Sequence, residues 1–174
     1  DDVLSSVGAN APAGSDPPPR GNGDAVSIAW TARTESNTAD AIFEFDGATS
    51  WKQFRRAARD FAVPSQNLVY ADRAGNIGWT IAGKIPRREG GYDPLLPSDW
   101  SQAGVGWNGW LTPQEYPHLP NPPSQRLWTA NARTLDFESI DFKNLGDGGF
   151  DLGARTRQIR DDLKAKDHFS PDDA

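Results

Sequence analysis

The chain has 174 residues, which is enough for one domain with a sizeable core. Its formal net charge is −6 and its Lys and Arg form no block, so we expect no binding to nucleic acid. No apolar run reaches the length that crosses a membrane, and without Cys the chain has no disulfide or thiolate metal site. Met is also absent and residue 1 is Asp, so we expect the chain to be part of a longer protein.

The first third of the chain is predicted to change from linker to regular structure. Residues 1–24 are expected to be a loop or linker, because ANAPAGSDPPPRGNGD is rich in Pro, Gly and Asp. The β-forming run AVSIAWTAR at 25–33 predicts a strand, and residues 38–48 are compatible with a helix. Thr49 or Ser50 can cap a further helix, whose apolar side chains recur at helical spacing: Trp51, Phe54, Ala58 and Phe61.

Two β-rich runs at 67–71 and 77–82 predict a β-hairpin. The residues between them include Asp72, Gly75 and Asn76, which tolerate the positive φ of hairpin loops. Pro86 is expected to end the second strand, because proline cannot donate to a β-ladder.

The rest of the chain alternates long loops with two further elements. Residues 87–125 are loop-rich, which is typical of a functional segment or of one packed over something larger. The run RLWTANA predicts a third strand, and GARTRQIRDDLKAK at 153–166 predicts an amphipathic helix. Residues 167–174 are expected to form a polar tail.

The Trp residues and carboxylates leave several kinds of site open. Trp30, Trp79 and Trp128 fall in predicted strands and are expected in the core. Trp100, Trp107 and Trp110 fall in the loops, where they could face a ligand such as a sugar. Acidic groups and loop carbonyls could hold Ca²⁺, whereas His118 and His168 have no partner at metal-ligand spacing.

Asn131 follows a strand-like run, and the residues alone leave its role open. It could close a turn, or its amide could stabilise an oxyanion formed by a nucleophile elsewhere.

Several ordered motifs resemble the penicillin acylase family of N-terminal nucleophile hydrolases, in the interior of its β-subunit. The likeness covers roughly residues 25–166 and starts with a helix followed by Pro-x-Gln-Asn, Tyr-Ala-Asp-x-x-Gly-Asn-Ile-Gly and Gly-x-x-Pro-x-Arg. The matching residues are Pro64, Gln66, Asn67, Tyr70, Ala71, Asp72, Gly75, Asn76, Ile77, Gly78, Gly83, Pro86 and Arg87 or Arg88. The segments GYDP, GWNGWLTPQEYP, NPPSQRLWTANAR and GARTRQIRDDL then follow in the family's order.

The resemblance implies an α+β fold, as part of a four-layer αββα sandwich with antiparallel strands and long loops. It also implies an amidohydrolase in which an N-terminal Ser attacks an amide carbonyl and its own α-amine serves as the base. That Ser is expected outside this chain, so we expect the chain alone to be inactive. The expected partners are the remaining acylase segments, namely the upstream β-chain and the α-chain, and a small acyl-amide substrate.

The resemblance also carries over individual site residues. Asn131 matches the side-chain donor to the oxyanion, although Ala132 replaces the second Asn of many members. Arg155 matches an arginine that orients the network of the nucleophile's amine, with a register left uncertain by Arg157. Pro94 matches a loop-carbonyl ligand of a structural Ca²⁺, and Asp141 is the nearest match to a carboxylate ligand.

Three functional readings therefore remain, the last of which is a structural domain of an exported protein with no small ligand. The first is a fragment of an acylase that cleaves a β-lactam antibiotic or an N-acyl-homoserine lactone, with a periplasmic or extracellular location expected from the family. The second is a Trp-rich, non-catalytic β-domain that binds carbohydrate or calcium.

Overall fold

The computed structural model describes residues 3–4, 26–34, 37–94, 96–135, 145 and 150–173. The elements in chain order are β1 (Val3–Leu4), β2 (Val26–Ser27), η1 (Thr31–Arg33), α1 (Thr38–Asp46), α2 (Trp51–Asp60), β3 (Gln66–Ala71), β4 (Ile77–Ala82), β5 (Pro86–Glu89), β6 (Gly106–Trp110), β7 (His118–Pro120), α4 (Ala154–Lys164) and η2 (Pro171–Asp173). Within these ranges no helix is both long and apolar enough to cross a bilayer.

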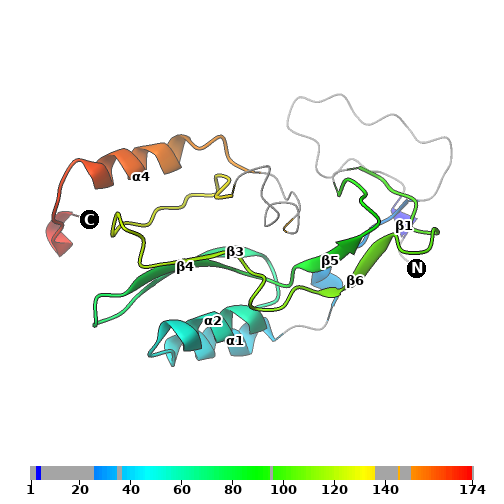
Figure 1. The fold of residues 1–174 in the computed structure, drawn as a ribbon, viewed down its shortest axis with the longest axis horizontal. Coiled ribbons are helices and arrows are strands. Elements are labelled where there is room, and N and C mark those ends of the chain that lie inside the picture. Colours follow the sequence, from blue (N-terminus) through cyan, green and yellow to red (C-terminus); the bar gives the residue numbers. More distant parts are fainter. Residues whose placement is uncertain are drawn as a thin grey trace.

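A three-stranded antiparallel sheet, in the order β3-β4-β7, organises the chain. Helices α1 and α2 lie on one side of it, whereas α4 lies on the other side beyond the segment 121–135 (Figure 1). Strands β5 and β6 form a separate two-stranded sheet, and so do β1 and β2. The arrangement of helices over antiparallel sheets agrees with the expected α+β class.

Helix α2 begins at the cap that the sequence predicts. The Ser50 hydroxyl accepts the Gln53 backbone N–H at 3.3 Å, and the Gln53 side chain accepts the Thr49 N–H at 2.8 Å. These reciprocal bonds satisfy backbone donors that the first turn of a helix leaves free. On the sheet side, Trp51 and Phe54 pack against the Tyr70 ring of β3 at centroid distances of 5.5 and 5.2 Å.

Strand β4 is enclosed on both of its faces. Its five residues from Gly78 to Ala82 are all buried. Trp79 and Ile81 point to one face and join a core cluster with three further buried residues: Ile85, Leu111 and Tyr116. Gly78 points to the opposite face, where the Trp51 ring of α2 lies so close that an added Cβ would meet it at 2.7 Å.

The expected β-hairpin is confirmed, with β3 and β4 paired from Gln66–Ala82 to Ala71–Ile77. At its tip the Asp72 carboxylate accepts the backbone N–H groups of Ala74 and Asn76, each at 2.9 Å. Gly75 has φ 86°, a conformation that glycine adopts without a steric penalty.

The strand expected at 25–33 is wrong beyond its first residues. Extended structure stops at Ser27, and η1 follows, with the Arg33 N–H bonded to the Trp30 carbonyl at 3.1 Å. The Trp30 side chain is 62% exposed, so the expectation of a core position fails, whereas Trp79 is buried as expected. Short β-forming runs do not stay extended without a long partner strand.

The strand expected at 126–132 is wrong as well. This part of the chain carries one isolated bridge, between Ala132 and Asp151, and no strand. Gln125 and Asn131 have φ values of 51° and 63°, which interrupt an extended ladder at both ends.

Pro86 does not end the second hairpin strand. Strand β4 stops at Ala82, where Gly83 has φ 115°, and Pro86 is the first residue of β5 and pairs with Trp110. Proline is tolerated there because the first position of a strand does not require its missing N–H.

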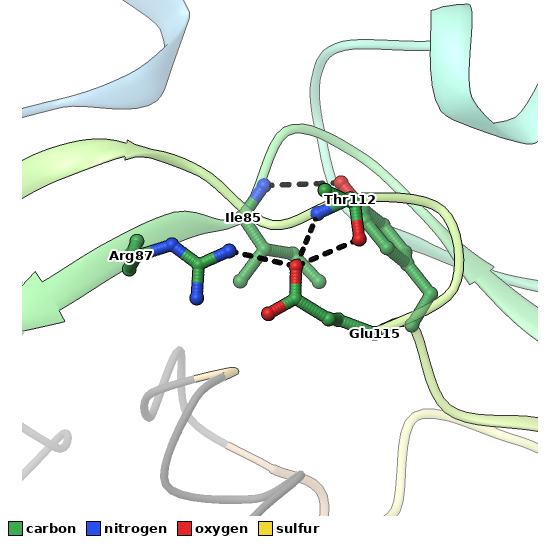
Figure 2. Close-up of polar contacts among 5 residues, drawn as sticks. Ile85, Arg87, Thr112 and Glu115 are labelled. Atoms are coloured by element: carbon green, nitrogen blue, oxygen red, sulfur yellow. Dashed lines mark hydrogen bonds and ion pairs between the residues drawn. The ribbon is translucent and has the colours of Figure 1, made fainter.

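A turn at 112–116 is hydrogen-bonded to the start of β5 (Figure 2). The Glu115 carboxylate accepts the Arg87 guanidinium at 2.7 Å, together with the backbone N–H and the hydroxyl of Thr112 at 2.7 and 2.8 Å. These hydrogen bonds, with the Arg87 bond the strongest influence, lower the pKa of Glu115 to about 2. Next to it, the buried Tyr116 hydroxyl donates to the Gly83 carbonyl at 2.6 Å.

We expect Gly78→Ala to lower the stability of the protein. The new methyl group must displace the Trp51 ring, and overpacking of this kind costs about 1–3 kcal/mol. The midpoint of urea unfolding measures the loss. Gly47→Ala is the control, because the nearest atom to its added Cβ is 3.7 Å away. Equal midpoints for the two variants would mean that α2 does not pack tightly on β4.

The Glu115 interactions predict a stability that depends on pH. The folded-state pKa is about 2 and the ordinary value is 4.5. The stabilising contribution is therefore complete above the ordinary pKa and is lost as the pH falls from there toward the folded-state pKa. We expect the gap in urea midpoint between the wild type and Glu115→Gln to close as the pH falls through this range. Glu44→Gln, at an exposed residue of α1, is the control; a gap that stays constant with pH would contradict the assignment.

Candidate active site

Asn131 is fixed at a point where two distant parts of the chain meet. Its φ of 63° is in the left-handed region, which Asn tolerates better than most residues. Its carbonyl accepts the Asp151 backbone N–H at 2.9 Å, and the adjacent Ala132 forms a parallel bridge with Asp151. The backbone just before α4 is therefore held beside Asn131.

The first turn of α4 brings Arg155 to the same place. Gly153, with φ 87°, turns the chain into the helix, and its carbonyl accepts the Arg157 N–H at 2.9 Å. The Arg155 Nη2 then donates to Asn131 Oδ1 at 2.9 Å and to Asp151 Oδ2 at 2.7 Å. A second guanidinium atom, Nε, donates to the same Asp151 oxygen at 3.2 Å.

This contact determines which way the Asn131 amide points. A guanidinium has donors and no acceptor, so the Asn131 atom that faces Arg155 must be the oxygen Oδ1. The Nδ2 group, with its two N–H donors, is directed away from Arg155. Asn131 therefore presents a donor whose orientation is set by a neighbouring cation.

Only one of the two arginines considered for this role contacts Asn131 in the described part of the chain. Arg155 reaches Asn131, whereas the Arg157 Nε lies 3.7 Å from Asp161 Oδ2, one turn further along α4. The structure thus brings together Asn131 and Arg155, and their catalytic roles stay predictions.

Asp151 is a member of the site that our sequence reasoning missed. Its pKa is lowered, first by the hydrogen bond from Arg155 and then by the Leu152 backbone N–H, which lies 2.8 Å from Oδ1. The carboxylate is therefore ionised at neutral pH. Asp151 and Arg155 are four positions apart in the sequence, but Asp151 precedes α4 and lies in the bridge with Ala132, so the spacing alone does not place the two side chains together.

The arrangement can be compared with known proteins. The family model described as penicillin amidase matches residues 4–174 of the chain. The chain belongs to the penicillin amidase family.

Curated relatives and solved members of the penicillin amidase family agree with this assignment. The acyl-homoserine lactone acylase QuiP of Pseudomonas fluorescens is 32% identical over 115 residues, which are 66% of this chain and 14% of the relative. The penicillin G acylase of Escherichia coli is 32% identical over 132 residues, or 73% of this chain and 14% of the relative. A thermostable penicillin G acylase from Alcaligenes faecalis superimposes with a TM-score of 0.62 at 26% identity, covering 78% of this chain and 23% of the other.

The family assignment and the structural match support two of our expectations. The chain is part of an N-terminal nucleophile hydrolase fold of the α+β class, and its relatives are named as acylases. The chain spans about a seventh of the length of these curated relatives, at 14% in each case.

The site is open to solvent in this part of the penicillin amidase fold. The Arg155 side chain is 61% exposed, the Asp151 side chain is 37% exposed, and Asn131 is exposed. An amide donor stabilises a developing charge most strongly where water is excluded. Within the described residues, water therefore has access to the Asn131 amide.

The described residues do not by themselves make a calcium site. Pro94 lies in an exposed turn and offers one carbonyl oxygen, and Asp141 lies outside the described residues. In the described part of the chain no three His, Cys, Asp or Glu residues are grouped to hold a metal. Calcium takes six to eight oxygen ligands. The calcium expectation for Pro94 and Asp141 stays a prediction that needs ligands from elsewhere.

Of the three tryptophans expected in loops, Trp107 and Trp110 lie in strand β6, so the expectation is wrong for these two, and the three rings pack on one another at an angle. Trp107 lies 5.9 Å from Trp100 and 6.0 Å from Trp110 between ring centroids, with interplanar angles of 54° and 56°. Lys84 lies over the Trp110 ring at 5.6 Å. Tilted rings cover each other's faces with edges, so these three do not form a flat stacking platform for a sugar.

Proposed function

We propose that the protein containing this chain hydrolyses the amide between an acyl side chain and an amine nucleus. Asn131 donates from Nδ2 to the oxyanion, and Arg155 fixes the Asn131 amide. The observation that carries this proposal is the 2.9 Å hydrogen bond from the Arg155 Nη2 to Asn131 Oδ1. It leaves the N–H donors, and not the carbonyl, available to a substrate.

The chemistry of amide hydrolysis requires such a donor. Attack on the carbonyl carbon places negative charge on its oxygen, and a donor held in advance at that position stabilises the transition state. The Arg155 cation draws electron density toward Oδ1, which makes the opposite N–H bonds of Asn131 more polar. A fixed φ of 63° keeps the Asn131 backbone from reorienting this side chain.

The nucleophile and the remaining partners belong to the same proposal. The nucleophile is an N-terminal Ser outside this chain, activated by its own α-amine. The upstream β-chain and the α-chain supply the cover over Asn131 and the acyl pocket. The exposed Arg155 and Asp151 side chains support a role for such segments. A periplasmic or extracellular location is also part of the proposal and can be tested by cell fractionation.

The substrate class follows the names of the relatives. One is named an acyl-homoserine lactone acylase and another a penicillin G acylase. We therefore propose an N-acyl-homoserine lactone or a β-lactam antibiotic as substrate. The alternative of a non-catalytic sugar-binding domain has no supporting observation, because Trp100, Trp107 and Trp110 lack a common plane.

Asn131→Asp is expected to separate folding from catalysis. The new carboxylate still accepts from Arg155, so the melting temperature should not fall. It has no N–H donor and carries a charge of the same sign as the oxyanion, so turnover should fall by about 10²–10³-fold. The measurement is amine release from an N-acyl-homoserine lactone and from a penicillin by the complete acylase.

Asn121→Asp provides the opposite control. Asn121 also has a positive φ, of 43°, but its Nδ2 donates to Asn76 Oδ1 at the hairpin, at 3.1 Å. This variant should lose stability and keep its turnover. Full turnover in Asn131→Asp would exclude Asn131 as the oxyanion donor.

A further inference from the structure

We propose that Asp151 is a positioning residue for amide hydrolysis, because it holds Arg155 in the one orientation that fixes the Asn131 amide. The inference rests on the proposed function, since it assigns a role within that same site. Asp151 itself would not touch the substrate. It would act through Arg155 and through its backbone contact with Asn131.

Both carboxylate oxygens of Asp151 are held by donors. Oδ2 accepts the Arg155 Nη2 and Nε at 2.7 and 3.2 Å, and Oδ1 accepts the Leu152 backbone N–H at 2.8 Å. The Leu152 bond ties the carboxylate to the main chain, so its position does not depend on Arg155 alone. A carboxylate fixed in this way can in turn hold the guanidinium with two charge-assisted hydrogen bonds.

The three residues form a closed ring of contacts. The Asp151 N–H donates to the Asn131 carbonyl at 2.9 Å, the Asp151 carboxylate accepts from Arg155, and Arg155 donates to Asn131 Oδ1. Each member is therefore held by the other two. Without the Asp151 carboxylate, the Arg155 guanidinium loses the two hydrogen bonds that set its direction.

Arg155 needs this support because its side chain is long and 61% exposed. An exposed arginine samples many rotamers, and only those that reach Oδ1 orient the Asn131 amide. Catalytic groups that are misplaced by about 1 Å can lose 10²-fold in rate, so a loose Arg155 should be measurable in turnover.

Asp161, on α4, forms ordinary surface ion pairs and serves as a comparison for Asp151. Its carboxylate lies 2.7 Å from Arg160 and 3.7 Å from Arg157, and its side chain is 50% exposed. It matches Asp151 in residue type and in its four-residue spacing from an arginine. Its ion pairs with Arg160 and Arg157 lie within α4, so it is a suitable control.

The test is a double-mutant cycle in the complete acylase. Asp151→Ala should lower kcat by about 10- to 100-fold, the range seen when a partner that orients a functional side chain is removed. KM should stay within about 2-fold, because the ground-state contacts of the substrate are unchanged. In an Arg155→Ala background, Asp151→Ala should cause no further loss, since it acts through Arg155. Asp161→Ala should leave kcat unchanged.

Two results would overturn the proposal. One is an unchanged kcat in Asp151→Ala. The other is an equal loss with and without Arg155, which would show that Asp151 only supports the start of α4 through Leu152. If Asp151→Ala does not fold, Asp151→Asn takes its place in the cycle, because it keeps one carbonyl acceptor, and the same criteria apply.

The two proposals can fail separately. If Asn131→Asp and Arg155→Ala both lower kcat but the Asp151 variants do not, the oxyanion assignment stands and the role of Asp151 is rejected. If Asn131→Asp keeps full turnover, the proposed function is rejected, and the role of Asp151 with it.

Discussion

The structure depends on one constraint, which is that strand β4 must be buried on both of its faces. One face supplies Trp79 and Ile81 to the core cluster, and the other must admit helix α2 against a glycine. A strand covered on both sides belongs to an inner layer, because solvent-facing strands alternate buried and exposed residues. The helices on one side and the segment 121–135 on the other then follow as the covering layers (Figure 1).

Asn131 of the candidate site lies in the second of these covering layers, the segment 121–135. At Asn131 the chain turns through a left-handed backbone conformation. Helix α4 begins next to that turn, and its first-turn arginine reaches back to the amide. Neither residue is in the core, so their geometry relies on hydrogen bonds and an ion pair, and hardly at all on packing.

The sequence correctly predicted those elements that are determined by interactions between neighbouring residues. The Ser50 cap, the apolar spacing of α2 and the Asp72–Asn76 turn are specified by neighbouring residues, and they were predicted correctly. The expected strands at 25–33 and 126–132 failed because a strand needs a partner, which a short run cannot reveal. For the site, the family motifs pointed to Asn131 and Arg155. The contact between Asn131 and Arg155, and the role of Asp151 in it, could be found only in the structure, because Asn131 and Arg155 are 24 positions apart in the sequence.

That separation has a consequence for how the family can vary. The cost in entropy of closing a flexible loop rises by only about 0.6 kcal/mol for each doubling of its length. The parallel bridge from Ala132 to Asp151 fixes both ends of the connection between the two halves of the site. Insertions or deletions within that connection should therefore be tolerated among relatives, while the contact of Asn131 with Arg155 is retained.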